Sequence, residues 1–421
     1  MLTMVKASAL YIVIVIALVI GVLCSSLIIT AYYYKIQYQR KFRYDRLQTN
    51  LNSGIHILLG AETSTYAKEQ VVDLYQNQED SVTLKTVPWG LYTIGLCRSF
   101  VQKDTLYKAF SIGNAIDSAK WAALYLIDED RPLSVSGNTM IRGNAFIPKA
   151  GVKEAYVDGK AYLGDKRLVI GPKHNSEKIL PALRVEKLAY LNQLKTAFTD
   201  TLLPGADSIN ISYFSPTRIV HFKKKVMRLT HVKLSGNLVL YSDTSVTIDG
   251  TCTLQNIIVY AKSIHVNENF RGTCQLFATD SITVDKNGKM DYPSCLGILR
   301  YRNDKHTQGK ISIGENCTIT GAVFTYEKEK STLQTLIDMG RNAKVYGQVY
   351  AQGLVRFNTG GEVKGSLFTN RFLYQSTYTT YENYLINTSL DAKGLSPYYL
   401  TSALFPVSGK KQKVLQWLGS N

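Results

Sequence analysis

The feature that most limits what this chain can fold into is its first apolar run. Residues 7–34 hold no charged side chain and include the segment ALYIVIVIALVIGVL. About 20 such residues are enough for a helix to cross a bilayer, and three tyrosines at 32–34 end the run as an interfacial aromatic belt does. A cleaved signal peptide has a shorter apolar core, roughly 7–15 residues, followed by an A-x-A-like site. The sequence therefore predicts a transmembrane helix over 7–34, preceded by a leader at 1–6.

The helix is expected to continue beyond the membrane over residues 35–60. Apolar residues recur there at steps of three and four, at Tyr44, Leu47, Leu51, Ile55 and Leu58. That spacing places them on one face of a helix, although Gly54 has a low helix propensity. At about 1.5 Å per residue, the whole helix would be about 80 Å long. The sequence thus predicts one helix with a membrane-spanning half and an amphipathic half.

The N-terminus resembles that of type IV pilin-like proteins, in particular minor pilins and pseudopilins. The shared features are a short leader ending at Lys6, small residues after it, the long apolar run and the amphipathic continuation, all within residues 1–60. Most members have a Gly before the cleavage point and a Glu five residues into the mature chain, whereas this chain has no Glu before Glu62. The resemblance implies a cleaved leader and a bilayer anchor. It also implies that the partners are other subunits of a pilus or secretion machine, or further copies of this chain.

Two signals disagree about which side of the membrane carries the rest of the chain. Cations follow the apolar run at Lys35, Arg40, Lys41, Arg43 and Arg46, against Lys6 before it. The positive-inside rule would then keep the body in the cytoplasm. The pilin-like resemblance implies that the body lies outside, and we expect an inner-membrane protein with an extracytoplasmic body.

Residues 61–132 are expected to form a small α+β region containing a strand meander. Three stretches rich in β-formers, at 81–85, 91–100 and 105–112, are separated by turn residues. Pro88 and Gly90 mark the first turn. This small sheet is expected to pack on the N-terminal helix.

A short motif recurs through the rest of the chain. It reads apolar, any residue, Gly, any residue, apolar, aromatic, in copies that begin at Ile141, Val157, Ile319, Val345 and Val363, with a looser copy at Leu234. A second phrase recurs at intervals of 18 residues, from Ser245, Ser263 and Ser281. Self-similarity at a short fixed period is typical of solenoids. The sequence therefore predicts a β-helix-like β-solenoid over 133–375, with an ordinary antiparallel β-domain as the alternative.

Other segments interrupt and follow the predicted solenoid. A charged, Leu-rich insertion over 173–230 contains the stretch EKLAYLNQLKTA, which is expected to be helical over 186–197. Residues 376–421 form a C-terminal segment. The V-x-G-x-V phrasing of the motif also resembles bactofilin solenoids, and that resemblance implies a membrane-anchored scaffold that polymerises on the cytoplasmic face.

The motif also predicts where its side chains point. Alternate residues of a strand face opposite sides, so the first, third and fifth positions point inward and the aromatic sixth position points outward. The outward rings, as candidate interface residues, are Phe146, Tyr162, Phe324, Tyr350 and Phe368. A continuous aromatic stripe is rarely left bare, so we expect the insertion, the C-terminal segment or a partner subunit to cover it. The alternative is a bulge at the Gly that reverses the phase and buries the rings in the core.

The chain is basic, with 49 Lys and Arg against 32 Asp and Glu and a net charge of +17. Such a surplus favours anionic partners such as DNA, acidic glycans or lipid headgroups. The densest basic stretch is HFKKKVMRLTHVK, over 221–233. Its candidate polyanion-binding residues are Lys223, Lys224, Lys225, Arg228 and Lys233. The alternative is a solvated strand face.

We find no motif for a metal, a cofactor or a catalytic group. None of the six histidines pairs with another at metal-ligand spacing, and the sequence has no C-x-x-C, nucleotide-binding loop or hydrolase signature. The acidic run Asp128, Glu129 and Asp130 is interpreted as a solvated turn. Outside the apolar run lie Cys97, Cys252, Cys274, Cys295 and Cys317. An odd number cannot pair completely in a monomer, and we expect buried, small apolar residues.

Together these features predict a non-enzymatic, single-pass envelope protein that is a structural component of a surface filament or secretion machine. One alternative is a cytoplasmic bactofilin-like scaffold, and another is a solenoid that binds DNA or a glycan polyanion. A polysaccharide-cleaving β-helix would need acidic residues clustered along one face, and the sequence indicates no such cluster.

Overall fold

The computed structural model describes residues 7–62, 64–76, 80–193, 208–222, 226–301, 307–376 and 379–420. This part of the chain is mainly β, with one long N-terminal helix, as the sequence predicts. It divides into two compact units. The helix unit holds the chain up to Lys85 together with Leu96–Lys108, and the β-body holds Thr86–Gly95 and Ala109–Gly419.

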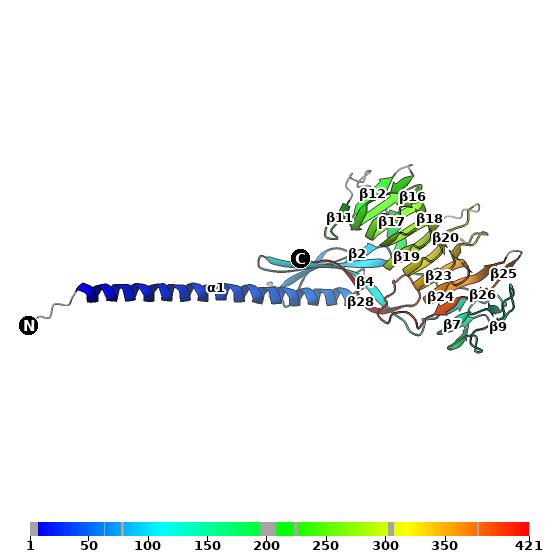
Figure 1. Cartoon of the computed structure of the whole chain (residues 1–421), viewed down its shortest axis with the longest axis horizontal. Helices are drawn as coiled ribbons and strands as arrows, with labels where there is room; N and C mark the ends of the chain where they lie inside the picture. Colours follow the sequence, from blue (N-terminus) through cyan, green and yellow to red (C-terminus); the bar gives the residue numbers. More distant parts are fainter. Residues whose placement is uncertain are drawn as a thin grey trace, which may run out of the picture. The chain divides into compact units, whose positions relative to one another are not determined.

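The N-terminal helix, α1 (Ala7–Gly60), is continuous (Figure 1). Its first half carries exposed apolar side chains, among them Leu10 (65% exposed), Ile16 (53%) and Leu27 (68%). This stretch is long and apolar enough to cross a membrane, and none of it is buried within the protein. Apolar surface of this extent calls for lipid or for other apolar helices around it.

An antiparallel meander follows α1 in the chain. Its strands are β1 (Gln70–Asp73), β2 (Ser81–Trp89), β3 (Tyr92–Val101) and β4 (Asp104–Ile116). With the C-terminal strand β28 (Ser408–Ser420) they form a sheet in the order β1–β2–β3–β4–β28. All three predicted strands are present, but β2 runs through Pro88, and the turn falls at Gly90, where φ is +60°. The division between the two units falls within β2, β3 and β4.

The second half of α1 buries its apolar stripe within the helix unit. Leu47, Leu51, Ile55 and Leu58 are at most 5% exposed, whereas Tyr44 is 55% exposed and lies outside the packed stretch. A polar contact supports the same packing. The buried Asp80 carboxylate, before β2, accepts hydrogen bonds from Arg46 and from Asn50, which are one helical turn apart. The amphipathic half predicted from the sequence is therefore the half that packs.

Gly54 lies on this packed face, which explains a residue that the helix pattern alone disfavours. A Cβ at this position would lie 2.6 Å from Cys97 Sγ and 3.1 Å from Leu84 Cδ2, on the neighbouring strands β3 and β2. The missing side chain allows the helix to approach the strands closely.

Replacing Gly54 by alanine is expected to destabilise the helix unit, although alanine is the better helix former by about 1 kcal/mol. Overpacking against Cys97 and Leu84 is expected to outweigh that gain and to cost about 1–3 kcal/mol. Thermal unfolding of the full-length protein measures the difference. Gly60→Ala is the matched control, because no described atom lies within 4 Å of its Cβ position. A stabilised Gly54→Ala variant would contradict the close packing.

The β-body contains the remaining strands. One series runs down the chain as β11 (Ser208–Ile211), β12 (Arg218–Phe222), β13 (Met227–Leu229), β14 (Lys233–Gly236), β15 (Leu238–Ser242), β16 (Ser245–Ile248), β17 (Thr253–Val266), β18 (Arg271–Val284), β19 (Lys289–Arg300), β20 (Lys310–Ile313), β21 (Thr318–Glu327), β22 (Leu336–Met339), β23 (Lys344–Phe357) and β24 (Glu362–Gln375). The shorter strands are β5 (Leu124–Leu126), β6 (Leu133–Ser136), β7 (Met140–Arg142), β8 (Ala145–Ile147), β9 (Val152–Glu154), β10 (Lys173–Asn175), β25 (Thr380–Glu382), β26 (Tyr384–Ile386) and β27 (Ser389–Asp391). Of these, β26, β6 and β9 form a separate three-stranded sheet.

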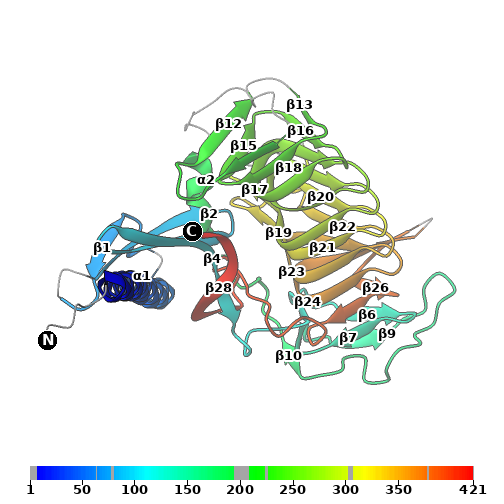
Figure 2. The ribbon, with the colours of Figure 1, turned by 60° about the vertical axis from the view of Figure 1, so that its left-hand side comes forward.

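Strands of the long series pair in parallel with equivalent residues aligned. Ser245 aligns with Ser263, and Ser263 with Ser281, so the phrases that recur every 18 residues lie in register. Figure 2 shows the strands stacked from β12 to β24. The strand order of this sheet returns on itself, so the parallel sheet is closed. Each of these 18-residue repeats therefore forms one layer of the closed parallel sheet, and we call such a layer a coil.

Three of the motif glycines lie where successive coils approach one another closely. Gly321, Gly347 and Gly365 are aligned, each with φ of +140°. A Cβ on Gly347 would lie 2.0 Å from the carbonyl oxygen of Gly321, and one on Gly365 would lie 1.9 Å from that of Gly347. No side chain fits there, which is the physical reason for glycine at the third position of these three copies.

The first strands of the body pair with its last strands rather than starting the series. Leu124 of β5 aligns with Leu367 of β24, and Ile141 of β7 aligns with Leu390 of β27. In this region the order of the strands in the sheet therefore differs from their order in the chain. Period alone cannot reveal that segments so far apart in sequence are neighbours.

The motif copy at Val157 is not a coil. Val157 and Lys160 exchange backbone hydrogen bonds around Asp158 (φ +49°) and Gly159 (φ +74°), which makes a tight turn. Here Gly serves a left-handed turn, a use of glycine that the motif cannot distinguish from close coil packing. The repeat assignment of this copy is wrong.

The boundaries of the predicted insertion, 173–230, are also wrong. β10, β11, β12 and β13 already pair in the parallel sheet, so the intervening segment begins after Asn175 and ends before Ser208. Within it, a 3-10 helix (Val185–Leu188) and α2 (Ala189–Gln193) replace the longer helix predicted over 186–197, whose last residues lie outside the described chain. The segment 376–421 is likewise not separate, since β25, β27 and β28 are paired in sheets.

Inward-pointing aliphatic side chains fill the body. Ile319, Val323, Val345, Val349 and Val363 are at most 1% exposed and belong to one interior cluster. They occupy the first and fifth motif positions, which were predicted to point inward. Asparagines stack at one corner of the coils: Asn269, Asn287, Asn316 and Asn342 all have φ between 55° and 62°. Side-chain hydrogen bonds join Asn287 to Asn269 (3.3 Å) and Asn342 to Asn316 (3.2 Å).

Candidate functional site

The aromatic positions form a ladder that runs along one face of the body. We call the following aligned residues the aromatic ladder: His221, Tyr241, Tyr260, Phe277, Phe324, Tyr350, Phe368, Tyr125, Phe146 and His174, with Gly297 between Phe277 and Phe324. Several neighbouring rings stack, as Tyr125 does on Phe368 with centroids 5.2 Å apart and planes 6° apart, whereas His221 meets Tyr241 edge-on. Phe146, Phe324, Tyr350 and Phe368 thus belong to one continuous structure.

The central rings of the ladder point out of the interior and are covered by other parts of the β-body. Phe324, Tyr350 and Phe368 are at most 4% exposed, yet they lie outside the interior cluster. The Tyr350 hydroxyl donates a hydrogen bond to the Pro181 carbonyl oxygen (3.0 Å). The Phe405 ring packs against Phe324 with centroids 6.0 Å apart. The outward phase was predicted, and the segment after β10 and the C-terminal segment supply the cover.

Because the chain covers these rings itself, they are not a free surface for a partner. The half-buried Phe146 stacks on His174 with centroids 4.9 Å apart, near the end of the ladder. Tyr162 lies outside the ladder, packs against the interior cluster, and its hydroxyl donates to the Asp165 carbonyl oxygen. The expectation of an interface stripe is therefore corrected to an internal ladder for Phe324, Tyr350 and Phe368.

The candidate polyanion site is only partly visible. Lys223, Lys224 and Lys225 lie outside the described residues. Arg228 on β13 and Lys233 on β14 are exposed, but β13 stacks on β16 whereas β14 stacks on β11 and β17. These two cations therefore lie in different columns of the sheet and do not form a single cluster.

All five cysteines outside α1 are buried free thiols. Burial raises the pKa of the Cys97 thiol and that of the Cys274 thiol to about 12. Cys252, Cys274 and Cys317 belong to the interior cluster. They pack as the small apolar residues expected from the sequence.

Because the pKa values of these buried thiols are raised, we predict that the protein loses stability at alkaline pH. Below the ordinary thiol pKa of 9.0 the thiols are protonated in both the native and the unfolded state, so the free energy of unfolding is not reduced by their ionisation. Between pH 9.0 and about 12 the unfolded thiols ionise while Cys97 and Cys274 stay protonated, so each destabilises the fold by about 1.4 kcal/mol per pH unit. Urea midpoints of the full-length protein at pH 8, 10 and 11 are expected to fall. The fall should be shallower in a Cys97→Ala, Cys274→Ala double variant, and an equal fall would contradict the assignment.

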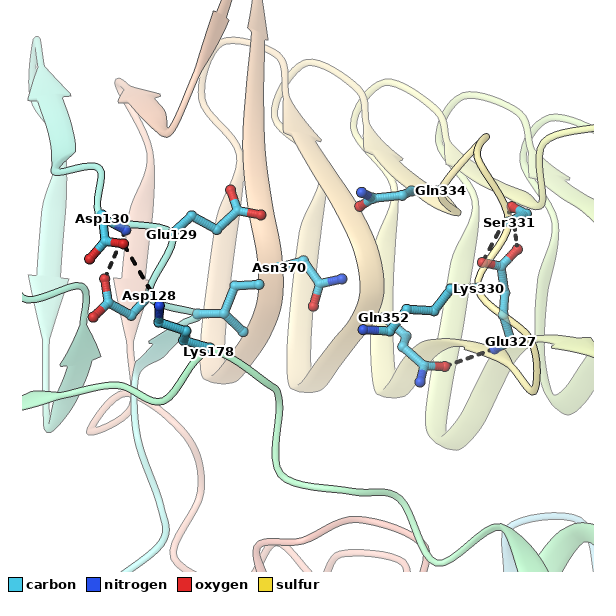
Figure 3. Close-up of a pocket in the computed structure, with 11 residues that line it drawn as sticks. Asp128, Glu129, Asp130, Lys178, Glu327, Lys330, Ser331, Gln334, Gln352 and Asn370 are labelled. Atoms are coloured by element: carbon cyan, nitrogen blue, oxygen red, sulfur yellow. Dashed lines mark hydrogen bonds and ion pairs between the residues drawn. The ribbon is translucent and has the colours of Figure 1, made fainter.

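A polar cavity of about 520 Å³ lies at a corner of the β-body, where several coils turn. Figure 3 shows its walls: on one side Asp128, Glu129, Asp130 and Lys178, in the middle Asn370, and on the other side Gln334, Gln352, Lys330, Ser331 and Glu327. The remaining lining residue, Ile127, is apolar. The volume suits a small ligand, since ligand sites typically enclose about 300–1,000 Å³.

Ion pairs and hydrogen bonds hold most of the cavity's carboxylates. Glu327 pairs with Arg300 (3.2 Å) and accepts a hydrogen bond from Ser331 (3.2 Å). Glu129 accepts two hydrogen bonds from the Arg371 guanidinium, at 2.8 and 3.0 Å. The carboxylates of Glu327 and Glu129 therefore have mainly a structural role.

Asp128 differs from the other carboxylates of the cavity. It is only 3% exposed, so the interpretation of residues 128–130 as a solvated turn is wrong for this residue. Among the described residues, the one hydrogen-bond partner of its carboxylate is the backbone N–H of Asp130 (3.0 Å). No pattern in the sequence indicates the cavity, because its walls come from five separate stretches of the chain.

Comparisons with known proteins add little to this description. No protein-family model matches the chain, and no curated protein matches it. Among solved structures, the competence-associated pilin ComZ from Thermus thermophilus is similar, with 9% identity over 84% of this chain and 86% of that chain and a TM-score of 0.22. Because so low a TM-score does not show a common fold, the similarity assigns no function to this chain.

Proposed function

We propose that this chain is a non-enzymatic, single-pass envelope protein that acts as a minor pilin-like or pseudopilin-like component of a surface filament or secretion machine. The observation that carries the proposal is the two-part helix α1. Its first half exposes an uninterrupted apolar surface, and its second half packs on strands of its own unit. That division suits a helix held by lipid or by like helices at one end and by its own domain at the other.

In this proposal the β-body is a β-solenoid. The alignment of equivalent residues every 18 positions supports this interpretation. Solenoids present long surfaces along their stacked coils, which suit contact with other subunits or with further copies of the same chain. The partners are then the lipid bilayer and neighbouring envelope subunits.

The side of the membrane decides between this proposal and its main rival. We place the body outside the cytoplasm, in accordance with the pilin-like N-terminus. Alkaline phosphatase fused after Asn421 is expected to be active, and a fluorescent protein fused there and exported by the general secretory route is expected to stay dark. The opposite pair of results would favour a cytoplasmic, bactofilin-like scaffold.

Processing of the N-terminus is a second, independent test. Pilin-like maturation removes the leader, here within the first eight residues. Intact-mass measurement of protein extracted from native membranes is expected to show that loss. A chain that keeps its leader would favour a plain signal anchor.

A further inference from the structure

We propose that the polar cavity of the β-body binds a neutral, hydroxyl-rich ligand of the saccharide class. The proposal concerns the cavity alone and goes beyond the structural role above. Its basis is the set of polar groups in the cavity that the fold leaves without partners, together with the balance of charge around them.

Three amide side chains face the cavity with unused hydrogen-bonding capacity. No hydrogen bond within the described residues engages the Asn370 amide. Gln352 uses its oxygen to accept the Glu327 N–H (2.8 Å), which leaves its NH₂ group without a partner in the same residues. The Gln334 side-chain oxygen is buried without a partner in the described chain. Polar groups left unpaired destabilise the fold, so a ligand whose hydroxyls pair with these amides is favoured.

The buried carboxylate of Asp128 adds a fourth group of this kind. With 3% exposure and one backbone N–H as its partner, it retains acceptor capacity that water or a ligand hydroxyl would use. Amides both donate and accept, carboxylates accept, and a hydroxyl does both. The four groups therefore match a ligand whose surface is made of hydroxyls.

Charge selects against ionic ligands. Glu327 is paired with Arg300 and Glu129 with Arg371, and Asp130 lies 3.9 Å from Lys178. Asp128 and the exposed Lys330 offset one another in formal charge. The basic surplus of the whole chain is thus not found at the cavity, and a polyphosphate or an acidic glycan would meet carboxylates there with no surplus of cations. Nor do the described residues contain a group of three or more His, Cys, Asp or Glu side chains able to hold a metal ion.

Isothermal titration of the full-length protein with maltotetraose and with chitotetraose tests the proposal. The protein should be kept in a zwitterionic detergent, because maltoside and glucoside headgroups would compete. We expect saturable binding of at least one tetrasaccharide. Gln352→Ala and Asn370→Ala should each weaken it about ten-fold, as the loss of one well-placed hydrogen bond does.

The matched control is Asn210→Ala, which removes an exposed amide on β11, outside the cavity, and should leave binding unchanged. Thermal unfolding of each variant shows whether it is folded. Absence of saturable binding of both sugars by the wild type would overturn the proposal. So would equal binding by the folded Gln352 and Asn370 variants, or binding of polyphosphate in place of the sugars. None of these outcomes bears on membrane side or leader processing, so the two proposals fail separately.

Discussion

Replacing Gly347 by alanine is expected to cost about 4 kcal/mol of folding free energy. The residue has φ of +140°, and its Cβ would lie 2.0 Å from the Gly321 carbonyl oxygen. Backbone strain of this kind costs about 1–3 kcal/mol, and forcing coils apart adds about 1–3 kcal/mol. Because native proteins are stable by only about 5–15 kcal/mol, the β-body of this variant should melt far below the wild type.

The same substitution at Gly159 is the informative control. The sequence presents Gly159 and Gly347 as equivalent positions of one motif, but no described atom lies within 4 Å of a Cβ at Gly159. Gly159→Ala then costs only the left-handed conformation, about 1–2 kcal/mol. Far-ultraviolet circular dichroism during heating measures both variants in the full-length protein. Equal losses would mean that coil packing does not explain the motif glycine.

Replacing Phe405 by alanine is expected to cost about 3–5 kcal/mol, as other large-to-small changes at buried aromatic residues do. Phe405 is 2% exposed and covers Phe324 and Tyr350, at ring-centroid distances of 6.0 and 6.5 Å. Its loss would uncover the middle of the aromatic ladder. The C-terminal segment should then become sensitive to protease at temperatures where the wild type resists.

Tyr398→Ala is the control for this second experiment. It removes a neighbouring aromatic ring that is 89% exposed, and exposed substitutions usually change stability by no more than about 0.5 kcal/mol. If both variants unfold at the same temperature, the ladder is not held by its C-terminal cover. A partner subunit would then be the better explanation of the aromatic stripe.

The features that could be predicted from the sequence rest on local periodicity. α1 follows from an uncharged run and a stripe at three- and four-residue steps. The inward aliphatic and outward aromatic positions follow from the alternation of a strand. In both cases, residues that lie close together in space are close in the sequence or recur in it at a constant interval.

The stacked asparagines carry a further local signal, separate from the repeated motif. Each comes three residues after the last residue of a strand: Asn269 after Val266, Asn287 after Val284, Asn316 after Ile313 and Asn342 after Met339. Asparagine tolerates the left-handed conformation that such a corner needs. An asparagine at this constant offset from an apolar strand end therefore marks the corner of a coil in the sequence itself.

The features that the sequence could not predict depend on contacts that no local pattern encodes. Gly159 and Gly347 share a motif but differ in what surrounds them. Asp128 looks solvated in sequence, yet it is buried because segments from elsewhere in the chain surround it. The cavity could not be predicted for the same reason, since Asp128 and Asn370 are brought together only by the pairing of β5 with β24.

That pairing also sets the order in which the parts of the fold can form. β5 is synthesised long before β24, whose Leu367 lies about 240 residues after Leu124. At roughly 5–20 residues per second, the nascent β5 waits on the order of 12–50 s for its neighbour. Sequence separation of this size slows folding, so the body cannot close while its ribosome is still translating the long series. Completion of the fold is therefore a post-translational event, and any chaperone that attends this chain would find edges of β5 and β7 open until β24 and β27 are made.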